Sequence, residues 1–232
     1  SPATHAQNFD AQNNSIELLT LSTRNLAMSL TDQQKEKALF PMGDKEWLNI
    51  RLAPFGTKGL KFKEMKPGQI ALIHTVMNAG FSASGYHKAA SIMALEEYME
   101  ELKLRGDSAA KDDNAHGIGN YSIALFGTPE SDSSWSIRLH GHHLYLSFGV
   151  ADGKLVSTGP SFFGAQPHEV TEGPRKGWHV LRDEENQGRD LLLSMNKNQK
   201  SSAIISETMP RDVFSGNNAE ISNLKSDDGI AY

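Results

Sequence analysis

The period of the hydrophobic pattern changes along this chain of 232 residues, and that change constrains the fold more than any other feature. Before residue 120, apolar residues recur every three or four positions, as on one face of a packed helix. Residues 121–158 form short apolar runs separated by turn residues, as in β-strands, and helical spacing returns over 183–205. This order predicts an α+β fold, with N-terminal helices packed on a central antiparallel sheet of three to four strands and further helices after it.

Local signals mark the ends of several helices. Thr31 and Gln34 have the spacing of a capping box, in which each side chain satisfies a backbone donor of the other residue. Pro67 is expected to begin a helix, and Gly80 to end it in a left-handed conformation. Ser82 or Ser84 then caps a longer helix.

That longer helix has an apolar face and an acidic face. Its predicted buried residues are Ile92, Leu95, Tyr98, Met99 and Leu102. Glutamates at positions 96, 97, 100 and 101 are assigned to the solvent side. Paired carboxylates can perform acid–base chemistry, but a solvated helix face is the more common reason for such a run.

The strands are expected over residues 121–126, 135–140, 142–148 and 154–158, and Asp152-Gly153 is a strong hairpin signal. Residues 15–206 are predicted to form a single α+β domain. The polar residues 1–14 are expected to be a flexible N-terminus. Residues 207–232 are weakly patterned and are expected to be a tail that continues into a C-terminal part absent from this chain.

Composition excludes several classes of protein. The 28 acidic residues outnumber the 23 basic ones, so no basic surface is available for nucleic acid. The absence of cysteine excludes disulfide scaffolds, zinc ribbons, iron–sulfur clusters and a thiol nucleophile. The apolar runs are too short for a membrane span. A small, polar start without methionine resembles an exported chain after signal removal, or an artificial start, and we expect a periplasmic or extracellular protein.

Three of the nine histidines lie within four residues, at His140, His142 and His143. In an extended strand, His140 and His142 would project from one face and His143 from the other. Imidazoles spaced in this way, about 6–7 Å apart, can share one metal ion, with a third ligand from elsewhere. Alternatively, the histidines pack against Trp135 and Tyr145 and hydrogen-bond to the backbone. The residues leave both interpretations open.

Familiar catalytic motifs are absent. His168-Glu169 is not followed by the second histidine of a zinc-protease motif, and the chain has neither a G-x-S-x-G elbow nor a phosphate-binding P-loop. A hydrolase that works without a metal therefore has no motif in its favour.

Two strings of residues in the centre of the chain follow a recognisable order, and the N-terminal half adds a third. They are Trp135-x-x-Arg138-x-x-Gly141-His142-His143-Leu144, Phe163-Gly164-Ala165-x-Pro167 and Ile92-Met93-x-Leu95-Glu96. Over about residues 47–203 the chain resembles the bacterial family of domains of unknown function numbered 3500. The resemblance implies an exported protein in which His142 and His143 belong to the family motif, whereas the position of His140 often carries another residue.

The resemblance also implies how these histidines work. One of His142 and His143 is a metal ligand and the other supports it. Family members continue into a segment with an Asn-His-x-His motif, so this chain resembles the N-terminal portion of a longer protein. The remaining ligands would then come from that missing C-terminal segment or from a second chain.

Two functions follow as expectations. The first is an exported metal-binding protein, a metal-dependent enzyme with copper, zinc or iron held by His142 together with His143 or His140. Its small-molecule or polymer substrate would contact Trp135, Arg138 and Tyr145. The second is a non-catalytic binding module of the cell envelope, in which the histidines only stabilise the sheet.

Overall fold

The computed structural model describes residues 2–106, 116–130 and 133–208, with backbone alone for residues 2–14. The chain divides into two compact units, Ser1–Gln166 and Pro167–Tyr232. The boundary falls inside the range 15–206 for which a single domain is expected. Residues 2–14, expected to be flexible, belong to the first helix, and most of the expected tail lies outside the described residues.

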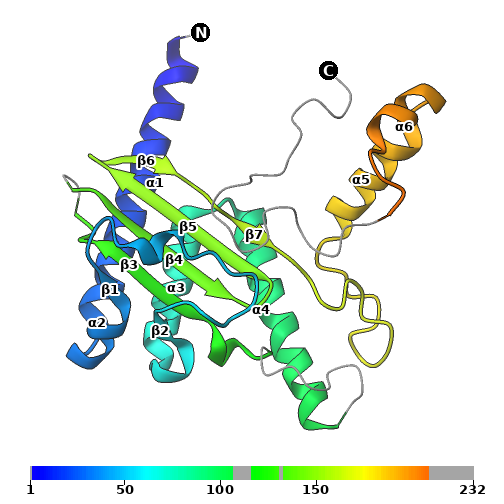
Figure 1. Ribbon diagram of the computed structural model, residues 1–232. Helices are drawn as coiled ribbons and strands as arrows, with labels where there is room; N and C mark the ends of the chain where they lie inside the picture. Colours follow the sequence, from blue (N-terminus) through cyan, green and yellow to red (C-terminus); the bar gives the residue numbers. More distant parts are fainter. Residues whose placement is uncertain (1, 107–115, 131–132, 209–232) are drawn as a thin grey trace. The chain divides into compact units, whose positions relative to one another are not determined.

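Helices of the first unit occupy the N-terminal half of the chain (Figure 1). Their bounds are α1 (Pro2–Ser29), α2 (Asp32–Ala38), α3 (Pro67–Gly80) and α4 (Ala83–Leu104), with 3-10 turns η1 (Lys45–Leu48), η2 (Phe62–Glu64) and η4 (Ile118–Asn120). The capping box is confirmed, because Thr31 N donates to Gln34 Oε1 at 3.0 Å and Gln34 N donates to Thr31 Oγ1 at 3.3 Å. Ser82 caps α4, accepting from Gly85 N at 3.2 Å.

The sheet of the first unit is mixed and has the strand order β1-β3-β4-β5-β6. Its strands are β1 (Leu39–Phe40), β2 (Leu60–Lys61), β3 (Ser122–Gly127), β4 (Trp135–Gly141), β5 (Leu144–Ala151), β6 (Lys154–Ser157) and β7 (Phe162–Phe163). Strands β3 to β6 are the predicted antiparallel meander, and β1 joins β3 in parallel. β2 and β7 add short antiparallel pairs to β3 and β5. The α+β prediction is confirmed.

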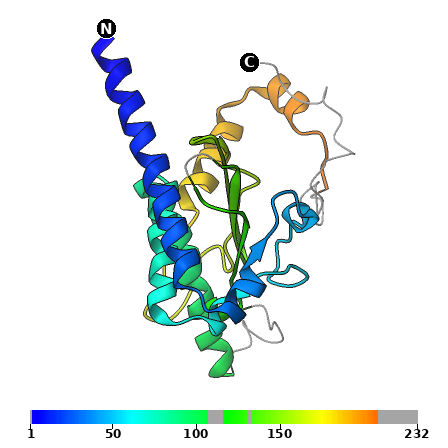
Figure 2. The same cartoon turned by 90° about the vertical axis from the view of Figure 1, so that its left-hand side faces the viewer.

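The two faces of the sheet are covered differently (Figure 2). One face packs against α3 and is apolar, with Ile137, Leu139 and Phe148 beside Ile73 and Met77. The other face is covered by the segment 44–59, whose residues bond to side chains of β4. Because side chains alternate along a strand, even-numbered residues of β4 face this segment and odd-numbered ones face the helices.

Gly80 does not end α3 in the predicted left-handed conformation; that prediction is wrong. It is the last residue of the helix, and its backbone φ is not positive. A Cβ at this position would lie 2.6 Å from Cζ of Phe148. Glycine is needed here because α3 approaches an aromatic ring of β5 closely.

The second unit contains α5 (Arg182–Ser194) and α6 (Lys197–Ala203), close to the predicted bounds. Before α5, Val170 is buried and exchanges backbone hydrogen bonds with Gly177 and Trp178. No described helix of either unit combines the length and apolar character that a membrane crossing requires.

Candidate metal centre

Glu96 of α4 is buried, and its predicted place on the solvent side is wrong. The buried stripe of α4 runs through Ala89, Ile92, Met93, Glu96 and Met99, at the three- and four-residue spacing of one helix face. Only 1% of Glu96 is accessible to solvent. The helix therefore places one carboxylate among the apolar residues that it packs on the sheet.

His142 and His143 form a tight turn rather than part of a strand. β4 ends at Gly141 and β5 begins at the paired Leu144, so the two histidines are the turn's central residues. The expectation that His140 and His142 share one strand face is therefore wrong. His143 has φ 58°, its amide donates to Leu52 O at 3.3 Å, and its carbonyl accepts from Gly164 N at 2.7 Å.

Gly141 allows an aromatic ring to approach this turn. A Cβ on Gly141 would lie 2.4 Å from three atoms of the Tyr121 ring. The hydroxyl of Tyr121 donates to His142 O at 2.7 Å, and burial raises the pKa of this hydroxyl well above its usual range, with the charge of Glu96 acting in the same direction. Gly141 thus leaves room for the Tyr121 side chain that holds the turn.

His116 comes from a third segment, directly before η4. Its carbonyl accepts from Asn120 Nδ2 at 3.0 Å, and its side chain is almost fully buried. No sequence pattern singles out this histidine.

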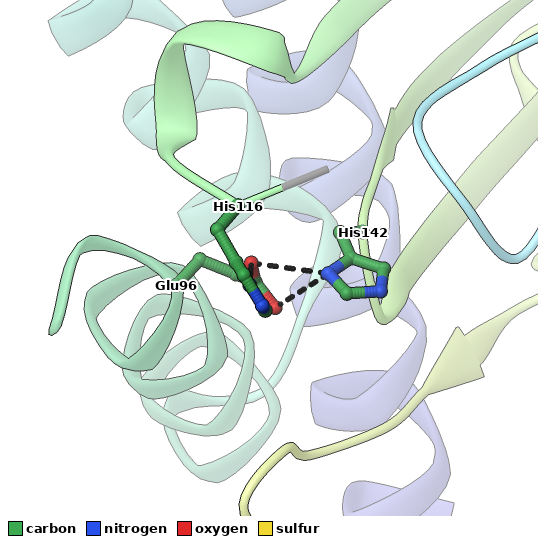
Figure 3. Close-up of side chains that lie close together, drawn as sticks. All are labelled: Glu96, His116 and His142. Carbon is green, nitrogen blue, oxygen red and sulfur yellow. Dashed lines mark hydrogen bonds and ion pairs between the residues drawn. The ribbon is translucent and has the colours of Figure 1, made fainter. Parts of the chain in front are cut away.

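The three imidazoles meet at the Glu96 carboxylate, and Figure 3 shows both carboxylate oxygens directed at one ring nitrogen of His142. His116 Nδ1 lies 2.9 Å from Oε2, and His143 Nδ1 lies 3.0 Å from Oε1. His142 Nδ1 lies between the oxygens, 3.1 Å from Oε1 and 3.2 Å from Oε2. An ionised carboxylate can only accept hydrogen bonds, so each imidazole in this arrangement carries its proton on Nδ1.

Electrostatics keep Glu96 ionised in spite of its burial. Burial by itself raises the pKa of a carboxyl group. Here the effect of burial is outweighed by hydrogen bonds from His142 and His143, by the charge of His142 and by a hydrogen bond from His116. Together they lower the pKa of Glu96 to about 2. The interior of the first unit therefore holds a permanent negative charge surrounded by imidazoles.

Three of these groups are placed to hold a metal ion. One ligand atom each from Glu96, His116 and His142 lies within 4.8 Å of the other two, and all three residues are buried. Ligand atoms around tetrahedral zinc are roughly 3.4 Å apart. The two nitrogen–oxygen pairs, at 2.9 and 3.2 Å, would therefore open slightly as an ion entered between them. A metal bound through Nδ1 requires each imidazole to carry its proton on Nε2 instead, and the Nε2 of His142 faces away from the carboxylate (Figure 3).

The other predicted site residues lie elsewhere in the first unit. His140 faces the covering segment 44–59, with Nδ1 2.9 Å from Thr57 Oγ1. Arg138 Nη2 pairs with Glu46 Oε1 at 3.0 Å, while Tyr145 packs edge-on against His140 at 5.8 Å between ring centroids. Trp135 is buried at the end of β4 opposite the turn. The structure brings His142 and His143 together and does not bring the other four to them; a substrate-binding role for Trp135, Arg138 and Tyr145 stays a prediction.

One sequence signal could have revealed Glu96. A glutamate spaced three and four residues from Met93, Ile92 and Met99 occupies the apolar stripe of its helix, and a buried charge requires partners. His116 had no such signal, since a single histidine in a polar loop is unremarkable.

Comparison with known proteins identifies a family but no function. The model of a family described as "Protein of unknown function (DUF3500)" matches residues 12–232. No curated protein and no solved structure shows a significant match.

Proposed function

Because this chain belongs to the DUF3500 family, whose function is unknown, we propose its function from the site itself: Glu96, His116 and His142 bind a divalent transition metal ion that serves catalysis. The observation that carries this proposal is the convergence of three ligand atoms from three separate segments within 4.8 Å. Catalytic zinc and non-haem iron sites use two imidazoles and one carboxylate, and imidazole also suits copper.

The carboxylate and the two imidazoles would contribute differently to binding the ion. The ionised Glu96 offsets part of the charge of a divalent cation, and the two imidazoles supply neutral nitrogen ligands. A bound ion of this kind supplies Lewis-acid chemistry or a water of lowered pKa. Burial of the ligands limits competing hydration, which strengthens electrostatic interactions within the site.

Metal analysis of the purified full chain tests this proposal. Protein prepared without chelator is examined by elemental mass spectrometry and then titrated with Zn²⁺, Cu²⁺ or, without oxygen, Fe²⁺. We expect near-stoichiometric binding of one of these ions, lost in His116→Ala and His142→Ala. His87→Ala, which alters an exposed histidine of α4, is the matched control and should bind like the parent. Equal binding by all three variants, or none by the parent, would reject the metal site.

A second function has its own support. Both oxygens of Glu96 accept hydrogen bonds from imidazoles without any ion, so the cluster also joins α4 to the β4–β5 turn as a structural element. A non-catalytic binding module with structural histidines would contain no metal, and its melting temperature would not respond to a chelator. A chelator-dependent melting temperature would exclude this alternative.

We also propose that the protein is exported. This proposal follows the resemblance of the chain to exported bacterial proteins. The absence of cysteine is compatible with it, because a chain without thiols cannot form unwanted disulfides in an oxidising compartment. Fractionation of the native cells, with a cytoplasmic enzyme as marker, provides the test. Recovery of the protein in the cytoplasmic fraction alone would contradict export.

A further inference from the structure

We propose that the metal has three protein ligands, Glu96, His116 and His142, and that His143 is a positioning residue which holds the Glu96 carboxylate. The fourth coordination position is then open to an exchangeable ligand, water or a small anion. This inference rests on the proposed metal site and states what that site can accept.

Each oxygen of Glu96 faces one imidazole of its own, and both oxygens face His142. Oε2 lies 2.9 Å from Nδ1 of His116 and 3.2 Å from Nδ1 of His142, which are the two imidazoles of the ligand group. Oε1 lies 3.0 Å from Nδ1 of His143 and 3.1 Å from Nδ1 of His142. An ion bound by Oε2 and the two ligand imidazoles leaves Oε1 to accept the hydrogen bond from His143. Carboxylates that bind metals are commonly oriented in this way by a second hydrogen bond.

Ring geometry excludes His143 as a ligand to the same ion. Its ring packs at a tilt against that of His142, with centroids 3.8 Å apart and planes inclined by 34°. A metal lies close to the plane of an imidazole that binds it, along the lone pair of the nitrogen. The Nδ1 atoms of His142 and His143 converge on Oε1 of Glu96, so one ion could bind both rings only at the place that this oxygen occupies. The ring of His116, in contrast, lies edge-on to that of His142 at 61° and can share an ion with it.

The backbone keeps His143 in this position. Its φ of 58° is fixed in a two-residue turn, and the neighbouring chain binds both its amide and its carbonyl. Moving the ring into the coordination sphere would require this turn to rearrange.

Exposure and charge indicate where the fourth ligand enters and what it is. The side chains of Glu96 and His116 are 1% and 2% exposed, whereas that of His143 is 20% exposed. Solvent therefore reaches the cluster from the side of the turn. A divalent ion with one carboxylate and two neutral imidazoles keeps a net positive charge, which favours water or a small anion as the remaining ligand.

Cobalt substitution of the full chain tests the open position. Co²⁺ is added, its visible absorption recorded, and the complex titrated with azide. Two variants suit the positive φ of residue 143. His143→Asn keeps an N–H donor, because its Nδ2 is attached to Cγ just as Nδ1 of histidine is, while His143→Gly has no donor. Circular dichroism of the metal-free variants confirms that they fold.

We expect azide to change the Co²⁺ spectrum of the parent and of both variants in a saturable way. His143→Asn should bind Co²⁺ within about threefold of the parent, and His143→Gly about 10–100-fold more weakly, the usual effect of losing a residue that orients a ligand. His142→Ala should lose more than either. A loss in His143→Asn as large as that in His142→Ala, or a spectrum that azide leaves unchanged, would overturn the open site. Failure of the parent to bind Co²⁺ would instead reject the metal site itself.

Discussion

At the scale of single residues, buried ionisable groups differ in which charge state their neighbours favour. Glu96 is held ionised by imidazole donors, and its pKa of about 2 lies below the ordinary value of 4.5. Its contribution to stability is therefore present above pH 4.5 and is lost as the pH falls from there through the folded-state pKa. His140 is held neutral, chiefly because burial, and secondarily the charge of Arg138, lower its pKa to about 4.

His140→Gln is expected to flatten the dependence of stability on pH between 6.5 and 4. The unfolded chain binds a proton at His140 below pH 6.5, whereas the folded chain resists it until about pH 4, so unfolding is favoured as the pH falls. A shift of this size amounts to about 3 kcal/mol of the free energy of unfolding at low pH. Urea denaturation of the parent and the variant at several pH values measures it. His87→Ala, at an exposed histidine, is the control; an unaltered slope in His140→Gln would contradict this reasoning.

At the scale of elements, a covering segment is attached to the sheet by a buried ion pair. Arg138 Nη1 donates to Glu46 O at 2.7 Å, and Nη2 donates to Lys58 O at 2.6 Å besides pairing with the Glu46 carboxylate. Arg138 is 1% exposed. One guanidinium of β4 thus binds both η1 and the chain before β2.

Glu46→Ala is expected to lower the free energy of unfolding by about 3–5 kcal/mol, because it leaves the Arg138 guanidinium buried without its counter-charge. Replacing both members, as Glu46→Leu with Arg138→Met, should recover much of that loss. Glu101→Ala, which breaks the exposed pair with Arg105, is the control and should be near neutral. Denaturant unfolding measures all three. A near-neutral Glu46→Ala would show that the segment does not depend on this pair.

Gly80→Ala is expected to destabilise the first unit by about 1–3 kcal/mol, since the new methyl group overlaps the Phe148 ring. The nearest ring atoms would be 2.6 to 3.0 Å from the added Cβ. Gly68→Ala is the matched control in the same helix, because a Cβ there meets nothing within 4 Å. Thermal unfolding should show a lower melting temperature for the first variant and an unchanged or higher one for the second. Equal melting temperatures would contradict the close contact.

At the scale of the whole molecule, the candidate metal centre belongs to one unit. Glu96, His116, His142 and His143 all lie in Ser1–Gln166, although they come from α4, the residues before η4 and the β4–β5 turn. An ion bound by all three segments would bind only the folded chain and would raise its melting temperature as its concentration increased.

A chain that ends at Gln166 is expected to fold and to bind the metal with the affinity of the full chain, since it contains every residue of the proposed site. Circular dichroism and calorimetric titration of the two chains, side by side, provide the comparison. Loss of binding by a folded short chain would mean that residues after 166 contribute a ligand.

The elements of this protein follow from local sequence rules. The capping box at Thr31, the start of α3 at Pro67 and the turn at Asp152-Gly153 each depend on residues close together in the chain. Both residues of that turn adopt positive φ, 49° and 66°, as the dipeptide predicts. The α+β class and the order of the longer helices and strands could therefore be predicted from the sequence, whereas the two-residue strands β1, β2 and β7 could not.

Only the tertiary structure decided which residues form the site. Glu96 lies 46 residues from His142 and 20 from His116 in the chain, and their meeting depends on how α4 packs against the end of the sheet. His140 lies outside the site because the β4–β5 turn begins at His142, one residue later than the sequence pattern predicts. Local interactions determine the elements because they act within a few residues. Convergence of side chains depends on packing, whose contacts join segments that no short pattern relates.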